Sequence, residues 1–259
     1  MSLEIIQQVE ERAAHAWPAA VVQIVDGWWL RFNQGVTRRA NSVWPHQAEG
    51  RMPLVEKLER VEEFYSERGL PVRYQMCPAC QPSELDSVLE DRGYWVDAPV
   101  LVQTAPLPTV LDSLPSSLAE TVTIGAILED TWFSAYCRAE DASEHGPYRR
   151  RDILQRIALP TGYAMLQLDG GPAAVGLGVL EQEWLGLYCM ATRPEYRRRG
   201  AATALLRSLA NWASGRGATR TYLQVTERNL PARALYERAG FETLYGYYYR
   251  QAAPGPAQR

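Results

Sequence analysis

Apolar residues in the second half of the chain switch between strand-like and helix-like spacing. Two apolar runs, 163–168 and 173–180, are joined by Asp169-Gly170-Gly171, a sequence typical of a β-hairpin turn. A third run of strand length follows at 184–190. Residues 200–214 then place apolar side chains at helical spacing. The pattern therefore predicts three strands followed by a helix.

Shorter segments surround these four elements. Pro231 stands in the first turn of the last expected helix, where proline is tolerated, and Gly240 follows the end of that helix. The further expected strands are 120–124, 219–225 and two short aromatic strands within 241–250, and the further expected helices are 129–137, 149–157 and 231–239. Strands and helices thus follow one another in mixed order.

The first half of the chain repeats part of this order. Gly69 precedes an expected strand and Gly93 follows the helix after it, and Gly217 and Gly240 stand in the same relation. The two glycine separations are 24 and 23 residues, a match that favours a duplicated unit. Further upstream, turn residues at 26–27 and 33–35 separate three strand-like runs, as in an antiparallel meander.

Prolines and serines between residues 105 and 118 interrupt both kinds of periodicity, which is typical of an extended connector. This linker divides the chain into an N-terminal domain of residues 1–104 and a C-terminal domain of residues 119–251, with a flexible tail at 252–259. The length of 259 residues also favours two domains, because one domain usually takes about 100–200 residues.

The overall composition excludes several classes of partner. A net charge of −3 gives little bulk attraction to nucleic acid or to an anionic membrane, so neither partner is expected. There is no apolar run of transmembrane length, and the first residues do not resemble a secretory signal. Four cysteines do not make a disulfide framework, so we expect a cytoplasmic protein. The oligomeric state cannot be deduced from these features.

Cys77 and Cys80 form an isolated Cys-x-x-Cys motif. A zinc site would need two further ligands at suitable spacing, and the other two cysteines and three scattered histidines do not provide them, so no metal is expected. A redox pair would need a helix that begins directly after the motif, whereas the expected helix begins near Pro82. A zinc or dithiol protein remains an alternative that metal analysis and thiol titration would decide.

The most informative segment is 190–202, Met-Ala-Thr-Arg-Pro-Glu-Tyr-Arg-Arg-Arg-Gly-Ala-Ala, where a strand ends in an arginine-rich turn and a helix begins at small residues. Backbone N–H groups of such a turn, together with the unpaired N–H groups of the first helical turn, can bind a phosphate. Gly200 permits a close approach or a positive φ, and the three arginines before it add positive charge. The alternative is a basic loop that is simply exposed to solvent.

Arg197, Gly200 and Ala202 have the spacing of Gln/Arg-x-x-Gly-x-Gly/Ala between a strand and a helix, and here the sequence resembles the GCN5-related N-acetyltransferase (GNAT) family. Residues 229–241, Asn-Leu-Pro-Ala-Arg-Ala-Leu-Tyr-Glu-Arg-Ala-Gly-Phe, are similar to the Asn-x-x-Ala-x-x-x-Tyr-x-x-x-Gly-Phe segment of that family. The resemblance covers residues 119–250. Two other phosphate-binding loops are excluded, because the chain has neither a Gly-Lys-Ser/Thr P-loop nor a Gly-x-Gly-x-x-Gly after a strand.

This resemblance implies a mixed α/β fold of two GNAT-like domains, in which a central mixed sheet is flanked by helices and one parallel pair of strands splays apart. It also implies acetyl-CoA as the cosubstrate, with the pantetheine arm on backbone groups of the strand end and the pyrophosphate on the arginine-rich turn. The cosubstrate-binding residues that it implies are Met190, Thr192, Arg197, Arg198, Arg199, Gly200, Ala201, Ala202, Asn229 and Ala232.

The same resemblance implies direct attack of a neutral amine on the thioester. Tyr236 is the expected general acid for the thiolate leaving group, and a packing or positioning role is the alternative. The base is less clearly indicated, because no carboxylate lies within the strand at 185–189. We take Glu183 as the candidate base, with Glu181, Glu227 or ordered water as alternatives.

The first half is expected to be a degenerate GNAT-like unit that shapes the acceptor site and binds no CoA. Residues 47–52 fit only two fixed positions of the signature, because Met52 replaces the small residue and Glu49 places negative charge where phosphate would bind. Leu89 and Glu90 stand near the position equivalent to Tyr236.

The sequence thus predicts an N-acetyltransferase that acts on a primary amine of a small molecule or peptide. A non-catalytic acyl-CoA-binding or regulatory protein is the alternative, and nucleic-acid binding by the arginine-rich turn is disfavoured by the acidic chain. His145, with Asp141 and Glu144 nearby, lies in a loop that borders the acceptor in this fold and is a candidate specificity element.

Overall fold

The computed structural model describes residues 2–46, 50–115, 121–140 and 148–252. It divides into two compact units, one made of Met1–Leu101 with Tyr245–Arg259 and the other of Val102–Leu244. Two strands, β5 (Trp95–Pro106) and β11 (Glu242–Gln251), have residues in both units. This division differs from the predicted boundaries at residues 104, 119 and 251, and the assignment of functional domains stays a prediction.

The first unit contains a sheet with the strand order β1-β2-β3-β4-β11-β5. The first three strands form the predicted antiparallel meander. Their bounds are β1 (Val21–Val25), β2 (Trp28–Phe32) and β3 (Val43–Pro45), followed by β4 (Arg73–Met76), and the helices are α1 (Leu3–Ala16), α2 (Leu54–Ser66) and α3 (Leu85–Asp91).

Strand β4 shows how the first unit is layered. Tyr74 and Met76 pack into the apolar core with residues of α2 and α3, such as Leu58. Successive side chains on a strand point to opposite faces, so Gln75 faces the other way. There its amide nitrogen donates to the carboxylate of Glu10 on α1, with an N···O distance of 2.5 Å. Helices α2 and α3 therefore cover one face of this sheet and α1 covers the other.

The second unit contains a sheet with the order β5-β10-β9-β8-β7-β6. The predicted hairpin is confirmed, since β7 and β8 pair antiparallel around Asp169 and Gly170, both at positive φ. The remaining bounds are α4 (Leu107–Ser113), β6 (Val122–Gly125), α5 (Asp130–Ala139), α6 (Arg151–Gln155), β7 (Thr161–Leu168), β8 (Gly171–Glu181), β9 (Trp184–Thr192), α7 (Ala201–Ser214), β10 (Arg220–Thr226) and α8 (Leu230–Arg238).

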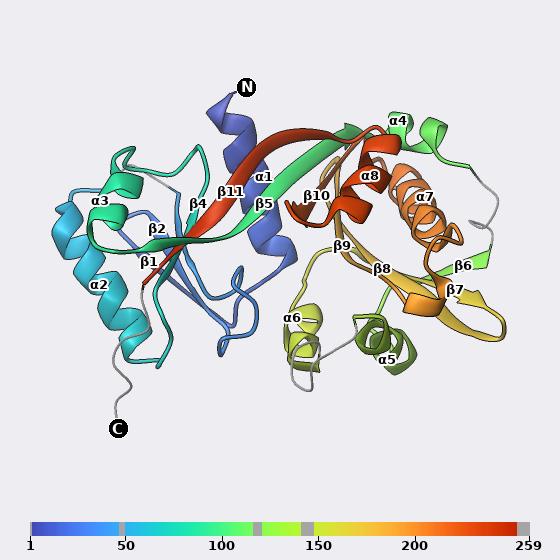
Figure 1. Cartoon of the computed structure of the whole chain (residues 1–259), viewed down its shortest axis with the longest axis horizontal. Coiled ribbons are helices and arrows are strands. Elements are labelled where there is room, and N and C mark those ends of the chain that lie inside the picture. The colour runs from blue at the N-terminus through green and yellow to red at the C-terminus, as the bar shows by residue number, and fades with distance from the viewer. Residues whose placement is uncertain (1, 47–49, 116–120, 141–147, 253–259) are drawn as a thin grey trace. The chain divides into compact units, whose positions relative to one another are not determined.

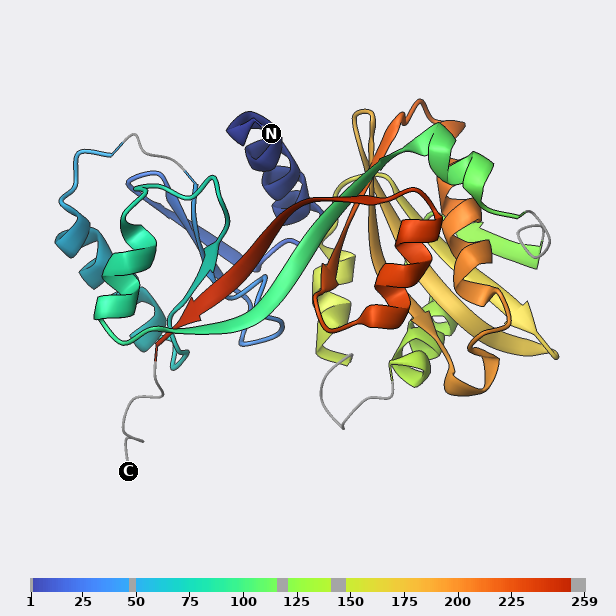
Figure 2. The same cartoon turned by 45° about the horizontal axis from the view of Figure 1, so that its top comes forward.

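Helices cover both faces of the second sheet. Figure 1 and Figure 2 show α7 on one side of β7 and β8 and α5 on the other. Leu205 and Leu209 of α7 are fully buried, and the indole N–H of Trp132 on α5 donates to the carbonyl of Ala164 on β7 at 2.9 Å. The predicted α/β fold with a mixed sheet flanked by helices is confirmed.

Two details of the prediction are wrong. Residues 242–251 form the single long strand β11 rather than two short strands, because aromatic and β-branched residues continue through Gly246 without a turn. The expected extended connector contains helix α4, which Pro108 permits because it lies at the start of the helix, where the missing N–H has no partner to lose. Residues 116–118 of the expected linker lie outside the described residues, as do residues 253–259 of the expected tail.

No helix among the described residues is long and apolar enough to cross a membrane.

Candidate active site

Strands β9 and β10 run parallel and then part. Their pairing extends from Trp184 opposite Arg220 to Leu187 opposite Leu223. Beyond these residues β9 continues to Thr192 and β10 to Thr226 with no further pairing between them. The backbone groups on the facing edges are therefore available to a ligand that pairs with a strand, and the predicted splayed parallel pair is present in the second unit.

A β-bulge lies on β9 where the strands have parted. Val175 of β8 is opposite Ala191, and Leu177 is opposite Tyr188, so two steps along β8 correspond to three along β9. The extra residue is Cys189 or Met190, and Cys189 has a φ of +50°, an uncommon conformation for a residue with a side chain. The bulge changes the direction of the backbone at Met190, in the part of β9 that no longer pairs with β10.

The arginine-rich turn after β9 presents a row of backbone N–H groups. Gly200 is the N-cap of α7 in the left-handed conformation, with a φ of +81°, and Arg198 has a φ of +63°. Within the described residues, no hydrogen bond involves the N–H groups of residues 198–202. Such a turn followed by a free helix N-terminus is a favourable site for an anion. The turn is held against β9 by Arg197, whose Nε donates to the carbonyl of Thr192 at 3.3 Å.

A cavity of about 620 Å³ connects the bulge, the turn and helix α8. Ten of the twelve residues predicted for the site line it: Met190, Thr192, Arg197, Arg198, Gly200, Ala201, Ala202, Asn229, Ala232 and Tyr236. The residues that the sequence analysis missed are Ala139, Glu140, Ala191, Tyr196, Thr203, Pro231, Leu235 and Arg238. The splayed strands, the arginine-rich turn and the predicted acid thus share one cavity.

Arg199 and Glu183 do not line this cavity. Arg199 turns to the β7–β8 hairpin, where its guanidinium lies 3.3 Å from the carboxylate of Asp169. Glu183 directly precedes β9, and its carbonyl accepts hydrogen bonds from the N–H groups of Thr219 and Arg220. Because a strand rises about 3.3 Å per residue, Glu183 lies roughly 23 Å along the strand from Met190.

Tyr236 lies on α8 and Asn229 is the N-cap of that helix, and both line the cavity. The side chain of Asn229 caps the helix by accepting the N–H of Ala232 at 3.3 Å. Tyr236 is 7% exposed, and burial raises the pKa of its hydroxyl to about 12. The hydroxyl therefore keeps its proton throughout the neutral range and can donate it only to a strong base, such as a thiolate that has just been released.

The model of the family described as "Probable histone acetyltransferase Rv0428c C-terminal" matches residues 4–250. The chain belongs to this acetyltransferase family.

Relatives across the family align with almost the whole chain. The "Uncharacterized N-acetyltransferase YobR" of Bacillus subtilis is 29% identical over 248 residues, covering 96% of this chain and 99% of that protein. The "Probable histone acetyltransferase Rv0428c" of Mycobacterium tuberculosis is 25% identical over 237 residues, covering 91% of this chain and 70% of that protein. A solved GCN5-related N-acetyltransferase from Kribbella flavida has a TM-score of 0.69 at 16% identity, covering 98% of this chain and 97% of its own.

The family model and the curated relatives confirm the predicted acetyltransferase relationship, and the chain is an acyltransferase. They do not identify the group that receives the acyl unit. The likeness to the Kribbella structure concerns the fold alone.

Glu140 is the one carboxylate residue among the described residues that line the cavity shared by the arginine-rich turn and Tyr236. It is the C-cap of α5, and its side chain lies 2.9 Å from the guanidinium of Arg150. The same guanidinium donates to the hydroxyl of Tyr136, whose pKa is raised by burial. Sequence reasoning missed Glu140 because only the folded chain brings the end of α5 beside β9. His145, Asp141 and Glu144 lie outside the described residues.

Cys77 and Cys80 lie in the first unit and are not among the residues that line this cavity. Their Sγ atoms are 3.8 Å apart, and the thiol of Cys80 donates to the carbonyl of Gln75 at 3.3 Å. A hydrogen bond to Cys80 and burial both raise the pKa of Cys77, which keeps the thiol protonated. Within the described ranges, no group of three or more metal-ligating side chains occurs.

The corresponding turn of the first unit already contains a carboxylate. The N–H groups of Arg51 and Met52 donate to the carboxylate of Asp26 at 3.0 and 3.3 Å, and the ammonium of Lys57 lies 2.8 Å from it. A Cβ on Gly50 would lie 1.7 Å from one Asp26 oxygen, so the carboxylate fills the space beside this turn. Residues 47–49 of the partial signature lie outside the described residues.

Proposed function

We propose that the second unit transfers an acetyl group from acetyl-CoA to a primary amine of a small molecule or peptide. The observation that carries this proposal is the single cavity in which the splayed strands, the N–H groups of the turn and the buried Tyr236 meet. A protein that only bound acyl-CoA would need the turn and the strands, but it would not need a protonated hydroxyl in the same cavity.

The residues present fit the diphosphate and amide groups of acetyl-CoA. We assign the diphosphate to the N–H groups of residues 198–202, with the guanidinium of Arg198 adding charge. The amides of the pantetheine arm would pair with backbone groups of Met190 and Thr192 at the splayed edge, as an added strand does. Asn229 and Ala232 line the cavity at the first turn of α8 and complete the site.

The chemistry follows from the groups around the bulge. A neutral amine attacks the thioester carbonyl, and the tetrahedral oxyanion needs a hydrogen-bond donor, a role we assign to the N–H of Met190. When the intermediate collapses, the C–S bond breaks and the thiolate takes a proton from the hydroxyl of Tyr236. The high pKa of Tyr236 supports this order of events, because the hydroxyl remains protonated until the thiolate appears.

The base that accepts the proton of the amine is a separate question. The carboxylate of Glu140 lines the cavity, whereas Glu183 lies at the far end of β9. We therefore propose that Glu140 accepts the proton, directly or through an ordered water, and we keep Glu183 as the sequence-based alternative.

Release of CoA tests the proposed function directly. Purified protein is mixed with acetyl-CoA and a panel of amines that includes amino acids, polyamines and lysine-containing peptides, and the free thiol of CoA is measured. Thiol release that depends on one class of amine and falls in the Tyr236→Phe variant supports acetyl transfer. Tight binding of acetyl-CoA with no release for any amine supports the alternative, an acyl-CoA-binding regulatory protein.

A further inference from the structure

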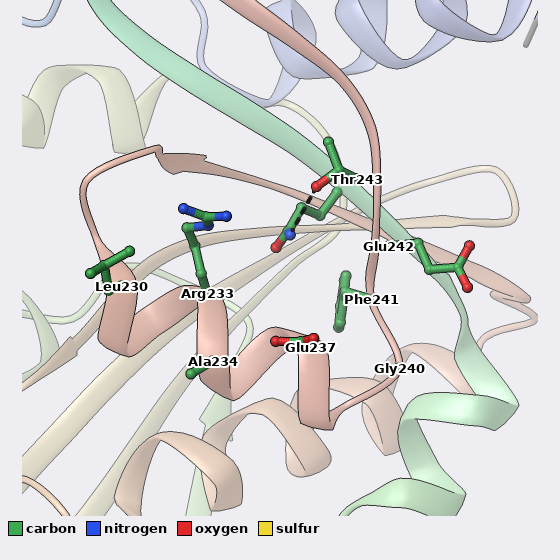
Figure 3. Close-up of a pocket in the computed structure, with 9 residues that line it drawn as sticks. Leu230, Arg233, Ala234, Glu237, Gly240, Phe241, Glu242 and Thr243 are labelled. Carbon is green, nitrogen blue, oxygen red and sulfur yellow. Dashed lines mark hydrogen bonds between the residues drawn. The ribbon is translucent and has the colours of Figure 1, made fainter.

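A second cavity of about 620 Å³ lies beside helix α8, on a different face from the acetyl-CoA site. Leu230, Arg233, Ala234 and Glu237 line it, and their spacing of three and four residues places them on one side of the helix. Figure 3 shows this helix face together with the first residues of β11. Tyr236 and the arginine-rich turn do not line this cavity, so it is separate from the proposed acetyl-transfer site.

Gln103 lines this cavity, and its side-chain oxygen has no hydrogen-bond partner among the described residues. The side chain is 6% exposed, and its Nε2 donates to the hydroxyl of Thr243 at 3.3 Å. Its Oε1 is buried and has no partner among the described residues. Exchanging the amide oxygen and nitrogen would still leave the end away from Thr243 unpaired. Buried polar groups are rarely left in this state, so a ligand that supplies the missing partner is favoured.

The charged side chains around Gln103 define what that ligand carries. Within the described part of the chain, Arg233, Glu237 and Glu242 form no ion pair with one another or with other side chains. Arg233 and Glu242 lie on opposite sides of β11 in Figure 3, and Glu237 lies one helical turn after Arg233 on α8. One arginine and two glutamates give the lining a net charge of −1. A ligand with one carboxylate and two ammonium groups complements this arrangement.

We propose that this cavity binds a basic amino acid, or a short peptide that ends in one. Its carboxylate pairs with Arg233, its ammonium groups pair with Glu237 and Glu242, and one ammonium N–H satisfies the buried oxygen of Gln103. The volume falls within the range of small-molecule sites, about 300–1,000 Å³. The site requires no bound acetyl-CoA and stands whether or not the acetyl-transfer proposal holds.

Calorimetry with three matched ligands tests the carboxylate and the side-chain ammonium of the proposed ligand. L-Lysine is titrated into the full chain without acetyl-CoA, alongside norleucine, which lacks the side-chain ammonium, and 1,5-diaminopentane, which lacks the carboxylate. Lysine should bind at least about tenfold more tightly than either analogue. No heat with lysine, or equal affinity for all three ligands, would overturn the proposal.

Two further measurements separate this cavity from the acetyl-CoA site. Lysine should bind equally well in the presence of saturating CoA, whereas competition between them would place lysine in the other cavity and refute the assignment. Gln103→Leu and Glu237→Gln should each weaken lysine binding about tenfold or more with CoA affinity unchanged. Glu63→Gln, at an exposed carboxylate of α2, is the matched control and should leave lysine binding intact. Unchanged lysine affinity in both cavity variants would also overturn the proposal.

Discussion

The turns before α2 and before α7 both contain backbone N–H groups that need a hydrogen-bond acceptor, and the two turns differ in where that acceptor comes from. Each turn has backbone N–H groups that do not take part in the hydrogen bonds within the following helix. Before α7, those of residues 198–202 form no hydrogen bond within the described residues, and three arginines at 197–199 precede Gly200 in the sequence. Before α2, two N–H groups donate to Asp26, and Lys57 pairs with the same carboxylate. The first unit thus pairs these N–H groups with a carboxylate of its own chain, whereas the described residues of the second unit provide no such partner.

This difference gives the two turns different expected affinities for a phosphate. A turn with unpaired donors needs an anion, and an aspartate from a neighbouring hairpin provides one permanently. A phosphate could enter the first unit only by displacing Asp26 from beside Gly50. The carboxylate of Asp26 at this turn is the physical reason to expect that the first half binds no CoA.

The largest expected effect comes from giving the second turn its own carboxylate. Gly200→Glu should weaken acetyl-CoA binding more than ~100-fold, because the new side chain places negative charge at the diphosphate site and disfavours a φ of +81°. Isothermal titration calorimetry measures the affinity. Gly217→Glu is the matched control, since Gly217 also has a positive φ and open space around it. Normal affinity in Gly200→Glu would contradict the placement of the diphosphate.

The next effect concerns the hydroxyl of Tyr236, because Leu89 and Glu90 stand near the equivalent position of the first unit. Tyr236→Phe should lower kcat about 100-fold while acetyl-CoA affinity changes little, because the ring still packs 5.7 Å from that of Phe241. With a pKa near 12, the hydroxyl stays protonated, so it should cause no loss of wild-type activity up to about pH 10. Full activity in Tyr236→Phe would leave this side chain only a packing role.

Glutamines at the two candidate bases should give a smaller effect. Glu140→Gln should lower kcat/KM about tenfold at neutral pH, with recovery at alkaline pH where more of the amine is already neutral. Glu183→Gln serves as the comparison, and its activity should stay near that of the wild type because the residue does not line the cavity. The reverse ranking would favour the base indicated by the sequence.

The smallest effect is on stability, at the carboxylate of the first turn. The hydrogen bond to Lys57 lowers the pKa of Asp26, so its stabilising contribution is complete above the ordinary carboxyl pKa and is lost as the pH falls through the lower folded value. Asp26→Asn should lower the Tm by a few degrees at pH 7, and the difference from the wild type should shrink below about pH 4. A Tm difference that stays constant between pH 7 and pH 3 would argue against this role.

Local sequence patterns predicted most elements of the second unit because each pattern stands beside a strong boundary signal. Asp169-Gly170-Gly171 marks the hairpin, and Gly200 marks the start of α7. The glycines that suggested a repeat, at 69, 93, 217 and 240, all have positive φ values. They end matching helices in the two units, which is why the repeat was visible despite few identities.

Features that depend on contacts distant in sequence were not predictable. The bulge at Cys189 is set by the register between β8 and β9, so the residue is half-buried at the site rather than packed within a regular strand. Glu140 reaches the cavity only because α5 packs on β8 and β9. Asp26 fills a turn that lies 24 residues further along the chain, at Gly50, and no periodicity could link the two.

The course of β5 has a practical consequence for dissecting the protein. Its last residues belong to the second unit, where β5 is the neighbour of β10 and the N–H of Leu107 donates to the carbonyl of Thr219. A truncated protein that began at residue 119 would lack this neighbouring strand. The backbone N–H and C=O groups along that edge of β10 would then be unpaired, which favours aggregation. Expression trials of the second unit alone should therefore begin upstream of Val102.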